Sequence, residues 1–201
     1  AYIITAGHVV PSVNPTRLAN RLTIVMQNGQ PLHAIGLANL YPAADVALIK
    51  VQGQPGLERL VARFGSSSKV QDGDQVWAFG YVGNPNDTHV QGGQGVNEAI
   101  NSYGIVTNAQ IEDHGVTYLT SSATLTEGFS GGPHVFISGV SGTTLNGCVI
   151  GINDAYVRPG QNGGQTPNLN EVLPADATLP LINKLLVRLQ GRPLSTTDLC
   201  H

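Results

Sequence analysis

Short runs of apolar and β-branched residues recur along the chain, and glycine, proline, asparagine or aspartate bounds each run. Pairs such as Asn28-Gly29 and Asp72-Gly73 are typical of tight turns between antiparallel strands. Many short strands at this spacing indicate a β-sandwich or a β-barrel, and the strand–helix alternation that a parallel sheet needs is not seen. The predicted strands cover residues 2–5, 22–26, 32–40, 46–51, 75–79, 104–109, 116–119, 134–137 and 147–152.

One segment near the C-terminus has helical spacing instead. Its apolar residues repeat every three or four positions, and Gly191 and Pro193 follow as stop signals; they are Leu179, Leu181, Ile182, Leu185, Leu186 and Leu189. We expect an amphipathic helix that packs on the β-structure, followed by a loosely held tail at 194–201. Two glycine-rich polar segments, 83–103 and 157–170, are predicted loops. Each either borders a substrate cleft or is disordered, and the sequence leaves both possibilities open.

Composition narrows the class of protein. The 201 residues are 41% hydrophobic and suffice for one all-β domain with a core. A net charge of −3 with 10 basic residues argues against a nucleic-acid partner, and no apolar run is long enough to span a membrane. The first residues resemble the middle of a strand, so we expect an upstream part to be missing and infer nothing about a signal peptide. Cys148 is expected to be a small buried side chain; a Cys148–Cys200 disulfide is possible, but the sequence does not establish it.

Three short segments carry candidate chemistry. Residues 128–133 read Gly-Phe-Ser-Gly-Gly-Pro, a turn that can expose the Ser130 hydroxyl and aim backbone N–H groups at one point. His8 ends a hydrophobic strand among small residues, as a general base would, and Asp45 precedes a buried strand, where a carboxylate can orient a histidine. Taken singly, each has a purely structural alternative: a Gly-Pro surface turn, a structural histidine, or a structural aspartate at the start of a strand.

Taken together, the three segments are far more specific. Their order along the chain, His8, Asp45 and then Ser130, is that of the chymotrypsin-like fold. Thr-Ala-Gly-His, Asp-Val-Ala-Leu-Ile-Lys and Gly-Phe-Ser-Gly-Gly-Pro resemble the signature segments of trypsin-like serine proteases, most closely the HtrA/Deg branch. The resemblance covers about residues 2–190 and is supported by segments 64–67, 70–80, 104–106 and 149–153.

The resemblance implies a fold and a domain plan. The fold would be all-β, with two six-stranded-type antiparallel barrels and a C-terminal helix. The whole chain, 1–201, would be a single protease domain. Its parts would be a first barrel at about 1–65, a second barrel at 66–175, the helix at 176–190 and a tail at 191–201. The family has one or two strands before the histidine strand, so the first barrel is expected to be incomplete here.

The same resemblance assigns roles to residues. Ser130 would be the nucleophile, His8 the general base and Asp45 its orienting acid, with the N–H groups of Gly128 and Ser130 as the oxyanion hole. Thr124 would lie near the base of the primary specificity pocket. A pocket wall that pairs with the substrate backbone would be formed by Gly151, Ile152 and Asn153. The pocket base carries no acidic residue and the wall no histidine, so we expect a small or medium apolar side chain rather than a basic residue or glutamate.

Other features modify this picture. Phe129 replaces the acidic residue that pairs with a new N-terminus in trypsin-type zymogens, so activation by that ion pair is not expected. Asp154 and Glu127 are interpreted as solvated loop carboxylates. The remaining histidines show no spacing typical of metal ligands, so we predict neither a metal site nor a cofactor; they are His33, His89, His114, His134 and His201.

The main functional hypothesis is a serine endopeptidase acting on peptide or protein substrates. The alternatives are a catalytically silent module of the same fold that binds peptides or partners, and an unrelated β-sandwich binding protein. By resemblance, an extracytoplasmic or secreted location is favoured, and the oligomeric state is left unassigned.

Overall fold

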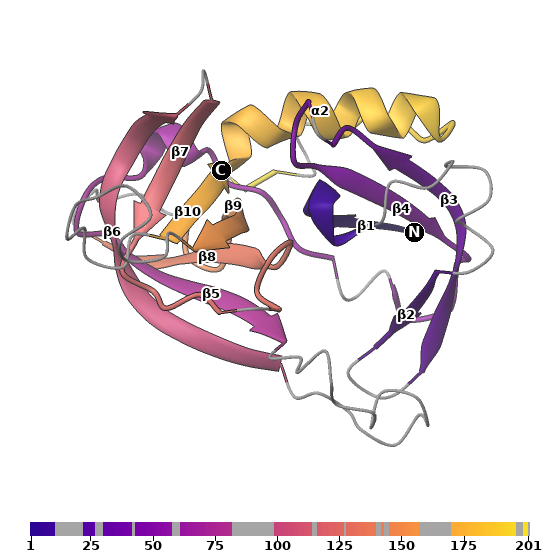
Figure 1. The fold of residues 1–201 in the computed structure, drawn as a ribbon, viewed down its shortest axis with the longest axis horizontal. Helices are drawn as coiled ribbons and strands as arrows, with labels where there is room; N and C mark the ends of the chain where they lie inside the picture. The colour runs from indigo at the N-terminus through magenta and orange to yellow at the C-terminus, as the bar shows by residue number, and fades with distance from the viewer. Residues whose placement is uncertain are drawn as a thin grey trace.

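The computed structural model describes residues 1–10, 22–26, 30–41, 43–57, 61–81, 99–113, 116–126, 128–139, 142, 145–156, 170–195 and 199–200. Within them the chain forms two β-sheets side by side, with one α-helix lying across both (Figure 1). The all-β class with a C-terminal helix is therefore confirmed. No helix among the described residues is both long enough and apolar enough to cross a bilayer.

The first sheet has four antiparallel strands in the order β1-β4-β3-β2. They are β1 (Tyr2–Thr5), β2 (Thr23–Val25), β3 (Pro31–Asn39) and β4 (Ala47–Val51). Burial alternates along the first half of β3, as expected for a strand with one face on a core. The enclosed side chains come from β3, β4 and the turn after β1: Val10, Leu32, Ala34, Leu37, Ala47, Ile49 and Val51. Among the described residues this sheet curls without closing into a barrel, in line with the incomplete first barrel that was predicted.

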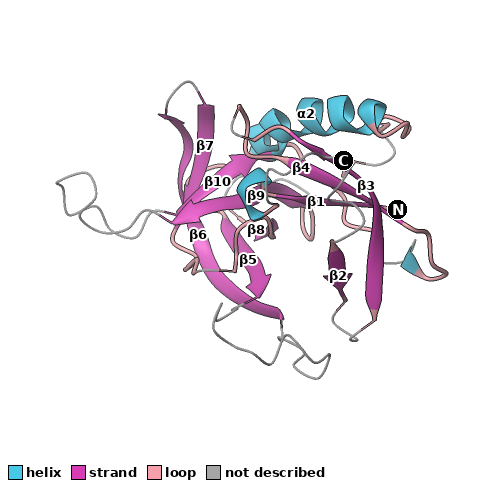
Figure 2. Cartoon of the chain, turned by 45° about the vertical axis from the view of Figure 1, so that its right-hand side comes forward, coloured by secondary structure: helices cyan, strands magenta, loops and turns pink. Residues whose placement is uncertain are grey.

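The second sheet is a closed six-stranded barrel in the order β10-β7-β6-β5-β8-β9. Its strands are β5 (Gln75–Tyr81), β6 (Ala99–Asp113), β7 (Val116–Ser121), β8 (Pro133–Ser138), β9 (Val149–Tyr156) and β10 (Asn170–Pro174). Its interior is filled by aliphatic and aromatic side chains, among them Val76, Val106, Leu119, Phe136 and Ile150. Figure 2 shows this barrel beside the open first sheet.

Two predicted loops are shorter than expected. The loop at 83–103 was predicted too long, because residues 99–103 pair with β5 as the first part of β6. The loop at 157–170 also ends early, since Asn170 begins β10, a strand that was not predicted. The polar pair Asn170-Glu171 hid this strand, whose clearly apolar residues are Val172 and Leu173. The remainder of both loops lies outside the described residues.

Helix α2 (Ala175–Arg188) joins the two sheets. One shared core contains Ile182, Leu185 and Leu186 of the helix, Leu48 of the first sheet and Leu173 of the barrel. Burying such aliphatic side chains stabilises the fold by about 1.5–3 kcal/mol each. The two sheets are therefore fixed relative to each other by a common hydrophobic core.

The chain after α2 is held more firmly than predicted. Leu199 forms a bridge with Phe64, and the Cys200 N–H donates to the Phe64 carbonyl at 2.7 Å. Cys148 and Cys200 form a disulfide, with their Cα atoms 6.3 Å apart. The prediction of a loosely held tail is therefore wrong at residues 199–200. Cys148 is 3% exposed, as expected, but it is half of a disulfide.

Candidate active site

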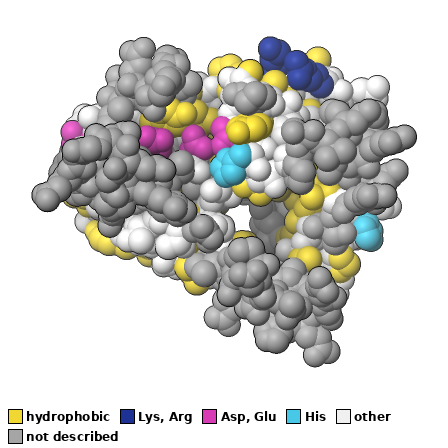
Figure 3. Space-filling view, viewed as in Figure 1, with side chains coloured by type: hydrophobic (Ala, Val, Ile, Leu, Met, Phe, Trp, Pro, Cys, Tyr) yellow, Lys and Arg dark blue, Asp and Glu magenta, His cyan; other side chains and the backbone are white. Residues whose placement is uncertain are grey.

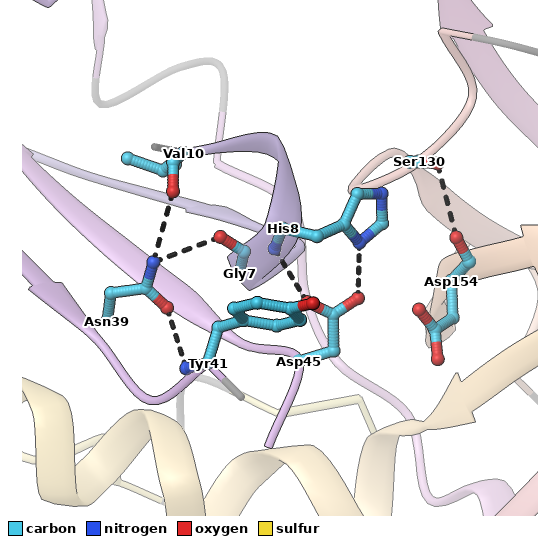
Figure 4. A network of polar contacts seen from close by, with 8 residues as sticks. All are labelled: Gly7, His8, Val10, Asn39, Tyr41, Asp45, Ser130 and Asp154. Carbon is cyan, nitrogen blue, oxygen red and sulfur yellow. Dashed lines mark hydrogen bonds and ion pairs between the residues drawn. The ribbon is translucent and has the colours of Figure 1, made fainter. Parts of the chain in front are cut away.

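His8 and Asp45 are brought together by the pairing of β1 with β4. Thr5 pairs with Ala47, so the short 3-10 turn η1 (Gly7–Val9) that follows β1 faces the residue that precedes β4. Asp45 accepts two hydrogen bonds from His8, from the main-chain N at 2.7 Å and from Nδ1 at 2.6 Å (Figure 4). The His8 side chain is 39% exposed and that of Asp45 16%. With its proton on Nδ1, the imidazole keeps Nε2 free to accept another proton.

Asn39 secures the turn that carries His8. Its amide donates to the carbonyls of Gly7 at 2.9 Å and Val10 at 3.3 Å, and its Oδ1 accepts from the N–H of Tyr41. Gly7 is required by space, because a Cβ atom there would lie 2.8 Å from Asn39 Oδ1 and 3.0 Å from Asp45 Oδ1. Hydrogen bonds from Asn39 therefore hold the turn of His8, and the two hydrogen bonds from His8 hold the Asp45 carboxylate.

Ser130 lies in a tight turn between the end of β7 and β8. Gly128 has φ of +98° and Gly131 of +84°, values that a side chain rarely adopts. A Cβ atom on Gly131 would overlap Thr5 Oγ1 and lie 2.7 Å from the Ala6 N atom. The turn of the closed barrel therefore abuts the end of the strand that leads to His8. In Figure 4 the His8 ring lies between Asp45 and the segment labelled Ser130.

Phe129 anchors this turn by packing into the barrel. Its side chain is 2% exposed and packs with Ala78, Ala123 and Leu125 in a small hydrophobic cluster. Gly80 makes room for it, since a Cβ atom there would lie 2.6 Å from the Phe129 Cα. The N–H groups of Gly128 and Ser130 have no acceptor within the described part of the chain. Among the described residues, both predicted oxyanion donors are therefore left without a hydrogen-bond partner.

Asp154 of β9 links the two halves of the site. Its main-chain carbonyl accepts the Ser130 hydroxyl at 3.2 Å, and its carboxyl group is hydrogen-bonded to that of Asp45. One ring nitrogen of His8 and one carboxyl oxygen each of Asp45 and Asp154 lie within 4.8 Å of one another. Figure 3 shows acidic side chains beside a histidine on this face. Asp154 was interpreted from sequence as a solvated loop carboxylate; it is instead a half-buried strand residue in contact with the site.

The two carboxyl groups have opposite pKa shifts. Burial raises the pKa of Asp154 to about 8, together with the hydrogen bond to Asp45 and the negative charges of Asp45 and Glu171; a hydrogen bond with Tyr118 acts against this shift. Burial alone would raise the pKa of Asp45, but hydrogen bonds with Asp154 and His8 outweigh it and lower this pKa below 3.8. The surroundings therefore favour the neutral form of Asp154 and the charged form of Asp45.

Comparisons with known proteins identify the family of this chain. The family model described as "Trypsin-like peptidase domain" matches residues 1–141. The chain belongs to the trypsin-like peptidase family. It is 31% identical over 190 residues to the Bacillus subtilis "Serine protease Do-like HtrB", and 28% identical over 190 residues to a Haemophilus influenzae "Probable periplasmic serine protease do/HhoA-like". Each match covers 92% of this chain but 36% and 34% of those relatives, so the chain spans about a third of their length.

A solved structure supports the fold of this trypsin-like peptidase. The "HtrA-type protease AlgW with decapeptide" superposes with a TM-score of 0.67 at 19% identity, over 93% of this chain and 49% of that one. The HtrA-type resemblance and the chymotrypsin-like fold expected from sequence are both confirmed.

The residues expected to form the pocket wall of this trypsin-like peptidase are engaged in pairing within the barrel. Gly151 and Ile152 pair with β8 on one side and with β10 on the other. Asn153 is fully buried: its backbone bonds Gly131 and Gly132, and its side chain bonds His134 and the carbonyls of Phe79 and Phe129. These three residues support the nucleophile turn and have no backbone edge left for a substrate.

In this peptidase the unpaired edge of β9 begins at Asp154, directly after Asn153. Beyond Asn153, residues Ala155 and Tyr156 pair with β10. Among the described residues, the opposite edge of β9 contacts the Ser130 hydroxyl at Asp154 and carries no further strand. Thr124 is exposed on the segment after β7. A signal for this open edge was present in the sequence. Residues 149–152 form an apolar run that must be buried in the barrel, so an edge open to a substrate had to begin after it.

Proposed function

We propose that the chain is a serine endopeptidase that uses Ser130, His8 and Asp45 as a catalytic triad. The observation that supports this most strongly is the double hydrogen bond from His8 to Asp45, at 2.7 and 2.6 Å, with the His8 ring toward the Ser130 turn. A carboxylate so placed fixes the histidine tautomer and stabilises the imidazolium formed during catalysis.

The proposed reaction has two stages. The Ser130 hydroxyl leaves the Asp154 carbonyl, gives its proton to Nε2 of His8, and its Oγ bonds to the peptide carbonyl carbon. The C–N bond then breaks as His8 returns the proton to the leaving amine, which leaves an ester on Ser130. Water attacks the ester with His8 as base, and the proton returns to Ser130 Oγ as the acid is released.

The oxyanion formed in both stages is assigned to the N–H groups of Gly128 and Ser130. Their positions are fixed by the positive φ of Gly128 and by burial of Phe129. Donors held in advance stabilise developing negative charge without reorganisation during the reaction, and one such donor accounts for about a hundredfold or more in rate.

Substrate binding is proposed along the open edge of β9 at Asp154–Tyr156 rather than at 151–153. A peptide strand added there would place its scissile carbonyl beside Ser130, and the Asp154 carbonyl would be free to accept a substrate N–H. The neutral side chain at the Thr124 position supports our proposal of a small or medium apolar residue before the scissile bond. Cleavage of a peptide library tests this preference, and a preference for arginine or lysine would contradict it.

A fluorophosphonate probe tests the proposed function without a known substrate. The wild-type protein should be labelled, Ser122→Ala should be labelled equally, and Ser130→Ala should not be labelled. Ser122 is a fair control because its hydroxyl accepts the N–H of Ile105, away from the triad. A folded wild-type protein that takes no label and cleaves no casein would instead be a silent binding module.

Asp45→Asn gives a second test of the triad. The asparagine can present an N–H group to Nδ1 of His8, which favours the wrong tautomer. We expect labelling of Ser130 to slow by about three to four orders of magnitude, with the folded structure retained. Near-wild-type labelling of a folded Asp45→Asn protein would contradict the role given to Asp45.

A further inference from the structure

Asp154 contacts both the nucleophile and the orienting acid, and its role below rests on the proposed function. Its main-chain carbonyl accepts the Ser130 hydroxyl at 3.2 Å, while its carboxyl group faces the carboxylate of Asp45 (Figure 4). Two carboxylates this close repel each other strongly if both are charged, so the pair should share one proton at neutral pH.

The surroundings decide which of the two carries the proton. Asp45 faces two donors on His8, the main-chain N–H and the Nδ1–H, and both hydrogen bonds stabilise a charged carboxylate. Asp154 is partly buried and lies near the negative charge of Glu171 on β10, with the Tyr118 hydroxyl of β7 as its other polar neighbour. A charge is therefore better accommodated on Asp45 than on Asp154.

We propose that Asp154 is a positioning residue whose carboxyl group keeps a proton at neutral pH and donates it to the carboxylate of Asp45. Asp45 then accepts three hydrogen bonds, two from His8 and one from Asp154, which fix its orientation against the imidazole. The proton stays on Asp154 throughout the reaction, and the pair carries a single negative charge. Asp154 thus acts on catalysis through Asp45 and does not touch the reacting atoms with its side chain.

This arrangement makes the site sensitive to alkaline pH. Among the described residues, the groups that face the Asp154 carboxyl group are Asp45, His8 beyond it, Glu171 and Tyr118. With its pKa raised to about 8, Asp154 loses its proton just above neutrality. Asp45 then loses a donor and gains a repelling charge, so His8 is less firmly oriented and Ser130 reacts more slowly.

The rate of fluorophosphonate labelling of Ser130, followed from about pH 6.5 to 9.5, tests the proposal. Wild type should slow by about threefold or more, with a midpoint near pH 8. Asp154→Asn keeps an N–H donor toward Asp45 but cannot ionise, so its alkaline decrease should disappear. Asp72→Asn, at an exposed position in the turn before β5, is the matched control and should keep the wild-type pH profile.

Two neighbouring substitutions should move the midpoint in opposite directions. Tyr118→Phe removes a hydrogen bond that stabilises the charged form of Asp154, so the midpoint should rise. Glu171→Gln removes a repelling charge, so the midpoint should fall. A role in stability alone would not produce these opposite shifts.

The outcomes separate the proposed function from the role of Asp154. A labelled wild type whose pH profile is unchanged by Asp154→Asn, or shifted equally by both neighbouring substitutions, would overturn the role alone. An unlabelled wild type would overturn the triad as well. If Asp154→Asn does not fold, Asp154→Ser supplies a non-ionising donor. In the Ser130→Ala protein, an NMR titration of the Asp154 carboxyl carbon should give a midpoint near pH 8, and one near pH 4 would contradict the proposal.

Discussion

At the scale of single residues, Phe129 is buried and fixes the Ser130 turn by hydrophobic packing. The acidic residue that trypsin-type zymogens have at this position would form an ion pair instead. The Phe129 ring packs with Ala78, Ala123 and Leu125 directly beneath Ser130. Phe129→Ala should cost about 3–5 kcal/mol in the free energy of unfolding and loosen the oxyanion turn, so labelling of Ser130 should also fall. Urea unfolding and probe labelling measure the two effects. Phe129→Leu, which keeps an apolar side chain, should lose much less of both; equal losses would show that burial is not the cause.

His134 makes a second prediction at this scale. Its ring is fully buried, Nδ1 bonds Asn153 Oδ1 at 2.9 Å, and Nε2 is without a partner among the described residues. Burial lowers its pKa from 6.5 to about 4. The folded state therefore binds fewer protons than the unfolded state between these values, and the stabilisation present above pH 6.5 is lost as the pH falls toward 4.

The measurement compares wild type with His134→Gln, because Asp154, whose pKa is raised, has the opposite pH dependence. Between about pH 7 and pH 4.5, the variant should gain roughly 2–3 kcal/mol in unfolding free energy relative to wild type. Chemical denaturation at both pH values gives this difference directly. Parallel pH dependence of the two proteins would show that His134 is not kept neutral by the fold.

At the scale of elements, the turn that follows α2 contains a strained residue. Gln190 has φ of +56°, and the Gly191 N–H donates to the Leu186 carbonyl at 2.7 Å to close the helix. The glycine thus lies one position beyond the residue that needs left-handed backbone. Gln190→Gly should stabilise the protein by about 0.5–1 kcal/mol, since the penalty for a side chain in this conformation is removed. Gln190→Ala, which keeps a Cβ atom, should give no such gain in thermal unfolding.

Strands and helices could be predicted from the sequence where a single pattern of apolar residues ran through the whole element. The strands with alternating or continuous apolar residues, such as β3 and β4, and the leucine repeat of α2 were all expected. Strand β10 was missed because its pairing partners, not its own composition, make it a strand. The spatial link from Asp154 to Asp45 joins residues 109 positions apart, and no local pattern carries that information.

At the scale of the whole molecule, the proposed site depends on holding two sheets together. His8 and Asp45 lie at the ends of strands of the open sheet and Ser130 in a turn of the closed barrel, so the core shared with α2 helps to set the distance between them. The Lys50 ammonium group adds a hydrogen bond from the open sheet to the Leu189 carbonyl at the end of α2. Among the described residues the first sheet does not close, so the helix rather than barrel closure fixes its place beside the second barrel.

The disulfide between Cys148 and Cys200 fixes the C-terminal segment to the barrel. It joins Cys148, in the barrel, to Cys200 across 52 positions, next to the bridge between Leu199 and Phe64. Restricting an unfolded loop of this length contributes about 4 kcal/mol in the chain-entropy description. Cys200→Ala should lower the unfolding free energy by up to about that amount, while leaving Ser130 labelling nearly intact because the core at α2 is untouched.

Reduction provides the matched control for this prediction. Dithiothreitol should destabilise wild type to a similar extent and leave Cys200→Ala unchanged, both read from urea unfolding. If reduction destabilises both proteins equally, the effect does not come from this bond.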